Sequence, residues 1–139
     1  MNSPILQPVM VLVLWSMVMW AWLYATRIPA MRAARTRLDA NLPREQITGN
    51  LPPRVRWKAD NYNHLMEQPT LFYATALVLA FVGAGEGPNL WLAWAYVALR
   101  VVHSLWQALS HVIIVRFSIF MAASLVLLAL AIRAAMAVF

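Results

Sequence analysis

The chain has 139 residues, of which 63% are hydrophobic, and a formal net charge of +6. A soluble domain of this size cannot bury so much apolar surface, so the composition excludes an ordinary water-soluble protein and favours one integral membrane domain over residues 1–139. There is no cysteine, and the histidines (His64, His103 and His111) lack metal-ligand spacing, so neither a disulfide nor a metal site is predicted.

The first apolar run covers about residues 8–26. At roughly 1.5 Å per residue this is enough helix to cross a hydrocarbon core of about 30 Å. No lysine or arginine precedes the run, which favours a transmembrane helix over a secretory signal peptide. Trp20, Trp22 and Tyr24 are typical of the aromatic residues found at a membrane interface.

The segment 27–58 separates this run from the next one. It carries eight of the eleven basic residues: Arg27, Arg32, Arg35, Arg37, Arg44, Arg54, Arg56 and Lys58. Nucleic-acid binding is one interpretation of such a cluster, but these residues lie between apolar runs and lack interleaved stacking aromatics. A basic cytoplasmic loop is the better interpretation, because positive charge is retained on the cytoplasmic side of membranes.

Three further spans are predicted, over about residues 59–82, 90–109 and 117–138. Pro69 is expected to bend or loosen the second span, and the sequence GAGEGPN at 83–89 is a strong turn signal. The link 110–116 is short, so the last two spans are expected to be antiparallel neighbours. The chain is therefore predicted to be all-α, a four-transmembrane-helix bundle.

The basic loop also predicts the orientation of these spans. With residues 27–58 in the cytoplasm, the N-terminus and the C-terminus both lie outside, although Arg133 mildly opposes this arrangement. The expected localisation is a multi-pass protein of the plasma membrane, or of the inner membrane if the host is bacterial.

Polar residues form a stripe along the third span. Arg100, His103, Ser104 and Gln107 follow an i, i+3, i+4, i+7 pattern, which places them on one helix face. A central arginine costs roughly 2.5–3.5 kcal/mol in a membrane helix and therefore needs a partner. Glu67 lies at a similar depth, about 13–15 Å from the cytoplasmic end, and is the predicted partner.

Other polar residues lie near the same level on neighbouring spans. Asn63 and His64 are close to Glu67, and Arg116 opens the fourth span. One alternative is that a Glu–Arg pair merely holds helices together. The number of polar groups on three helices instead favours a cytoplasm-facing site for a small anionic or zwitterionic ligand. A thiol in that ligand would be activated by Arg116 and the adjacent helix N-terminus.

These residues also carry a resemblance to a known family. The segments ADNYNHLMEQPTLFYATAL and AYVALRVVHSLWQAL, with an arginine sixteen residues after Arg100, resemble the MAPEG family of membrane-associated proteins in eicosanoid and glutathione metabolism. The resemblance implies a homotrimer that binds glutathione between neighbouring subunits. Arg100 and His103 match family residues on the third helix, and Arg116 matches the arginine that activates the thiolate.

The chain departs from the family pattern at three positions. The family has an Asn-x-x-Glu pair on its second helix, where this chain has His64 before Glu67. Gln107 stands where eicosanoid-type members often have tyrosine, and Phe120 lacks a hydroxyl. These differences resemble the divergent bacterial-type members.

The resemblance therefore implies a glutathione transferase or peroxidase acting on lipophilic substrates, with Arg116 as the catalytic residue. The residues expected to hold glutathione are Asn63, His64, Glu67, Arg100, His103 and Gln107. The alternative is a non-catalytic member that binds a lipid or a partner protein. A small transporter with Glu67 as its coupling site is a third hypothesis.

Overall fold

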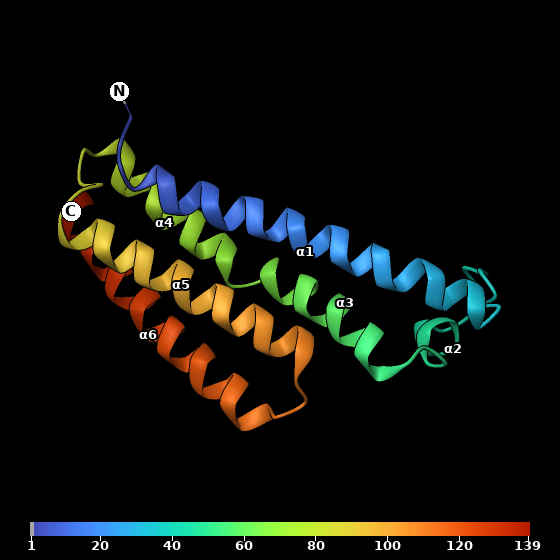
Figure 1. The fold of residues 1–139 in the computed structure, drawn as a ribbon. Coiled ribbons are helices and arrows are strands. Elements are labelled where there is room, and N and C mark those ends of the chain that lie inside the picture. The colour runs from blue at the N-terminus through green and yellow to red at the C-terminus, as the bar shows by residue number, and fades with distance from the viewer. Residues whose placement is uncertain (1) are drawn as a thin grey trace.

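A computed structural model describes residues 2–139, except for the side chain of Thr48, and Figure 1 shows the chain as a set of helices. They are α1 (Leu6–Ala33), α2 (Arg44–Thr48), α3 (Pro53–Leu65), α4 (Pro69–Phe81), α5 (Pro88–Leu109) and α6 (Ile113–Val138). No strand occurs among the described residues, which confirms the all-α prediction.

The long helices lie lengthwise against one another. Helix α1 packs against α3, α4 and α5, while α6 packs against α5 and α4. Figure 1 shows both ends of the chain at one end of the molecule and the segment that contains α2 at the other. Helices α1 and α3 extend past the α5–α6 link toward α2, so the basic segment projects beyond the rest of the molecule.

The first helix is longer than the run predicted at residues 8–26. It continues to Ala33, with Pro29 inside it, and so occupies the start of the predicted loop 27–58. Ala30, Met31 and Ala33 are strong helix formers, which explains why the helix continues beyond the proline. The same loop also contains α2 and the first turns of α3.

The predicted second span at 59–82 is divided into two helices. Helix α3 begins earlier, at Pro53, and ends at Leu65, and α4 begins at Pro69. Pro69 has no amide hydrogen to donate to the carbonyl of Leu65, four residues earlier, so the helical hydrogen bonds are interrupted there as the sequence predicted.

A tight turn and a short link position α5 and α6. Gly87, directly before α5, has φ +61°, a conformation that favours glycine, and the Asn89 side chain donates a hydrogen bond of 2.8 Å to the Ala84 carbonyl. Residues 110–112 join α5 to α6 as antiparallel neighbours.

The buried core is apolar toward the end where the termini lie. Its fully buried side chains come from α1, α4, α5 and α6, and include Leu12, Phe72, Ala76, Leu79, Ala93, Tyr96, Ala123 and Leu130. This packing leaves the large apolar residues of the outer helix faces exposed, among them Leu14, Leu71, Trp91, Ile132 and Met136.

Two of the described helices, α1 and α6, are long and apolar enough to cross a membrane. Their most apolar windows have mean hydropathy 1.8 and 2.4, yet only 28% and 17% of those windows are buried. The core helix of a soluble protein would instead be mostly buried. By the same measure α3, α4 and α5 do not qualify, because α3 and α4 are short and α5 carries the polar stripe.

Candidate functional site

The polar stripe of α5 faces the interior of the protein. Arg100 and Ser104 have no exposed surface, and His103 and Gln107 are 1% and 6% exposed. They continue the face that buries Ala93, Tyr96 and Val97 nearer the start of the helix. The i, i+3, i+4 spacing therefore predicted the orientation of the stripe correctly.

Arg100 makes its direct contact with α3. Its Nη2 atom lies 2.9 Å from His64 Nδ1 and 3.4 Å from the His64 carbonyl oxygen. The predicted direct ion pair between Arg100 and Glu67 is not formed within the chain: the Glu67 side chain is exposed, at the break between α3 and α4, although its negative charge still attracts Arg100. The depth argument correctly placed Arg100 level with this part of α3. The side chain that contacts it is His64, one turn before Glu67.

Two imidazole rings and a phenyl ring pack beside this contact. The centroids of His64 and His103 are 4.8 Å apart, and the Phe120 ring meets His64 edge-on at 5.2 Å. The Arg100 guanidinium carbon lies 5.8 Å from the centre of the Phe120 ring. Phe120 therefore supplies an apolar wall and a π face where the family pattern has a hydroxyl.

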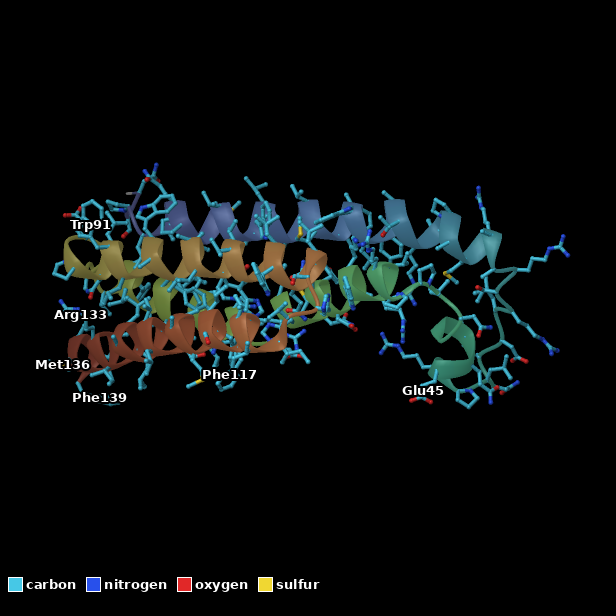
Figure 2. All side chains as sticks on the ribbon, turned by 60° about the horizontal axis from the view of Figure 1, so that its bottom comes forward. Glu45, Trp91, Phe117, Arg133, Met136 and Phe139 are labelled. Atoms are coloured by element: carbon cyan, nitrogen blue, oxygen red, sulfur yellow. The ribbon has the colours of Figure 1, made fainter. Side chains whose placement is uncertain are left out.

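A cavity of about 160 Å³ opens beside these rings. It is lined by His64, His103, Ile113, Arg116, Phe117 and Phe120. Arg116 is partly buried in the first turn of α6, and Phe117 is seen at the start of that helix in Figure 2. The fold thus brings together three predicted site residues, His64, His103 and Arg116, from three different helices.

The interior around the stripe holds several polar atoms that have no hydrogen-bond partner within residues 2–139. They are Asn61 Oδ1, Arg100 Nε and Nη1, His103 Nδ1, Ser104 Oγ and Gln107 Oε1. Buried polar atoms are normally paired in proteins, so this concentration, on one face of α5 and at Asn61 of α3, marks a polar interior of unusual chemistry.

Asn63 belongs to a second, larger cavity of about 360 Å³. That cavity lies between α1, α2 and α3 and is lined by Arg27, Arg44, Glu45, Leu51, Val55, Arg56, Trp57, Ala59, Asp60 and Asn63. In Figure 2 Glu45 lies on the projecting basic segment, well apart from Phe117. Next to this cavity, the Lys58 ammonium lies 5.1 Å from the centre of the Trp22 ring. Partial burial lowers the pKa of Lys58, and the positive charge of Arg54 lowers it further. Within one chain, Asn63 therefore does not share the cavity of Arg116.

Sequence reasoning missed a hydrogen-bonded group one turn away from Arg100. The Tyr96 hydroxyl donates to Gln68 Oε1 at 3.1 Å, and Gln68 Nε2 donates to Ser124 Oγ at 2.8 Å. The available signal was Tyr96 at i−4 from Arg100, on the same helix face.

The His64 and His103 rings lie beside each other at an interplanar angle of 32°, but two imidazoles alone do not make a metal site. Among residues 2–139 there is no group of three His, Asp or Glu side chains able to hold a metal ion. The chemistry of the smaller cavity is therefore set by Arg116, the imidazoles and the apolar walls.

Comparison with known families decides the family question. The model of the MAPEG family matches residues 5–136, nearly the whole chain. The chain belongs to the MAPEG family. No curated protein and no solved structure matches it. Membership confirms the resemblance seen in the motifs and, with the apolar helices α1 and α6, identifies an integral membrane protein of the glutathione and eicosanoid metabolism group.

Proposed function

We propose that this MAPEG protein binds glutathione and directs its thiolate against lipophilic electrophiles or peroxides. The observation that carries the proposal is the cavity in which Arg116 meets His64 and His103. Arg116 lies in the first turn of α6, where the helix dipole adds to its positive potential. A cation at a helix N-terminus lowers the pKa of a bound thiol and favours the nucleophilic thiolate.

The residues around the cavity fit the two substrates of such a reaction. Arg116 suits an anionic group of glutathione, and buried Arg100, which contacts the cavity-lining residues His64 and Phe120, adds positive charge behind the cavity wall. Ile113, Phe117 and Phe120 offer an apolar wall that continues toward the lipid-facing surface of α6. In the transferase reaction the thiolate sulfur forms a bond to the electrophilic carbon, and the leaving group departs with its electron pair.

A single chain supplies only part of this site. A cavity of about 160 Å³ is smaller than the roughly 300–1,000 Å³ usual for small-molecule sites, and the Glu67 and Asn63 side chains are exposed. We infer that a neighbouring subunit completes the site in a homotrimer. We also propose four membrane crossings, by α1, the α3–α4 pair, α5 and α6, with residues 27–58 in the cytoplasm and the N-terminus outside.

A non-catalytic role is the second candidate. Gln107 and Phe120 provide no hydroxyl, and Arg100 already uses one donor on His64. On this alternative the polar interior stabilises a surface that binds a lipid or a partner protein, and glutathione has no affinity for it.

Calorimetry with glutathione and a transferase assay on the detergent-purified protein separate the two candidates. We expect binding at millimolar glutathione or below, and turnover of a chlorinated aromatic electrophile. Arg116→Ala should lower kcat about 100-fold, since it removes the main stabiliser of the anion. Arg37→Ala, an exposed arginine of the basic segment, is the matched control and should leave kcat unchanged. Absence of binding favours the non-catalytic role, and full activity of Arg116→Ala would exclude that residue from the mechanism.

A further inference from the structure

The contact between Arg100 and His64 determines where the proton lies on the imidazole. Arg100 Nη2 is 2.9 Å from His64 Nδ1. A guanidinium has only donors and keeps its proton in proteins, so Nδ1 must be the acceptor. A neutral imidazole that accepts at Nδ1 carries its hydrogen on Nε2. His64 is therefore held in the Nε2–H tautomer.

The surroundings of His64 hold the ring in place as well as fixing its proton. Its carbonyl oxygen lies 3.4 Å from the same Arg100 atom. The His103 ring packs against it at a tilt of 32°, and Phe120 meets it edge-on. His64 lines the cavity together with Arg116, and its other ring neighbour there, Phe120, is apolar, so a ligand in this cavity can offer His64 a polar partner.

We propose that His64 donates its Nε2–H hydrogen bond to the reacting sulfur of the bound thiol. The inference rests on the proposed glutathione chemistry and assigns His64 to the sulfur rather than to the peptide. Arg116 and His64 then act on one atom from two helices, the first as a charge and the second as an oriented neutral donor. A hydrogen bond to the charged form of a group favours that form, so His64 stabilises the thiolate.

The same geometry excludes His64 as the base that ionises the thiol. Nδ1 is occupied by Arg100 and Nε2 already carries its hydrogen, so neither nitrogen accepts a further proton while the contact holds. The proton of the thiol passes to solvent water, and the negative charge left on the sulfur is stabilised by His64 and Arg116.

The tautomer is measured without any glutathione. Nitrogen-15 chemical shifts of the imidazoles in detergent-solubilised protein distinguish a protonated ring nitrogen from an unprotonated one. We expect Nδ1 of His64 to be unprotonated and Nε2 to carry hydrogen. Hydrogen on Nδ1 would overturn the inference, whatever the protein binds.

Two substitutions at His64 separate the donor from the contact with Arg100. The amide of Asn places a polar atom near the position of Nδ1, whereas the amide of Gln reaches the position of Nε2. His64→Asn retains an acceptor for Arg100 and loses the donor to sulfur. His64→Gln retains the donor. His111→Asn, at an exposed histidine outside the cavity, is the matched control.

The readout is the pKa of the bound glutathione thiol, followed by the ultraviolet absorbance of the thiolate. We expect His64→Asn to raise that pKa by about one unit, the effect of one hydrogen bond to a charged group, and His64→Gln to raise it less. Affinity for S-methylglutathione, which has no ionisable thiol, should stay the same in both variants. A purely structural role of His64 predicts instead that the Asn variant behaves as the wild type.

The outcomes are distinct for the two proposals. If glutathione binds but His64→Asn leaves the thiol pKa unchanged, or if only His103→Asn shifts it, the role of His64 is overturned and glutathione binding stands. If glutathione does not bind to the wild-type protein at all, the proposed function fails and the role at sulfur fails with it.

Discussion

Helix α5 buries two halves of opposite chemistry along one face. Its first half places Ala93, Tyr96 and Val97 in the apolar core, and its second half places Arg100 and His103 at the same angular position. Apolar packing stabilises the first half. In the second half, desolvation of the guanidinium opposes folding, and two of its nitrogen atoms have no partner within residues 2–139. Burial of the apolar residues in the first half therefore stabilises the fold. Burial of the charged and polar residues in the second half is better explained by the binding of a ligand.

The largest expected effect lies in the apolar core that the first half of α5 shares with α6. Leu130 of α6 has no exposed surface, so Leu130→Ala should lower the free energy of unfolding by about 2–5 kcal/mol through lost contacts and the remaining cavity. Unfolding in detergent, followed by circular dichroism, measures this loss. The affinity of the folded fraction for glutathione should not change.

Leu128 is the matched control for that substitution. It lies on the same helix with 55% of its surface exposed, toward the lipid. Leu128→Ala should change the unfolding free energy little, because it removes few protein contacts. Equal losses for the two variants would mean that the apolar core shared by α5 and α6 does not pack as described.

The next substitution should have the opposite pattern to Leu130→Ala, because it should preserve stability and abolish glutathione binding. Arg100→Leu replaces a buried charge with an apolar side chain, and such replacements are often neutral or stabilising by about 1–4 kcal/mol. We expect unchanged or higher stability, together with loss of glutathione binding, measured by unfolding and calorimetry on the same preparation. A loss of several kcal/mol would show that the contact with His64 maintains the fold and would remove the contrast between the halves.

Arg100→Lys distinguishes charge from geometry at the same position. A lysine ammonium keeps the charge but lacks the planar set of donors that a guanidinium offers. We expect weakened rather than abolished binding. Full binding by this variant would mean that charge alone is needed.

Much of the fold could be predicted from the sequence, because the length of an apolar run and the position of a proline act within a single helix. Apolar length located α1 and α6, and the missing amide hydrogen of Pro69 located the break between α3 and α4. The ends of α1 and α3 were not predicted, because Pro29 does not stop α1 and Pro53 begins α3 within the basic segment. An apolar run does not indicate either end, because strong helix formers extend α1 past Pro29 and a proline at the first position of α3 starts that helix among polar residues.

The site was predicted in part for a similar reason. Periodicity gave the buried face of α5, and depth along the helices brought His64 and Arg100 to one level. Depth along a helix does not predict the direction of a side chain next to a helix break. The depth argument therefore could not show that Glu67 is exposed and that His64 makes the direct contact with Arg100. The same limitation hid Gln68, whose amide lies inside between Tyr96 and Ser124.

The smallest expected effect lies at the boundary between the two halves of α5. Tyr96 stacks on Phe72 with ring centroids 4.7 Å apart, and its hydroxyl donates to Gln68 at 3.1 Å. Tyr96→Phe keeps the stacked ring and removes only the hydrogen bond, so the unfolding free energy should fall by about 0.5–1 kcal/mol. Gln68→Leu removes the acceptor of the same bond. The double variant should then lose less than the sum of the single losses, because residues that share one bond are coupled. Strict additivity would show that Tyr96 acts only through its ring and belongs wholly to the apolar half.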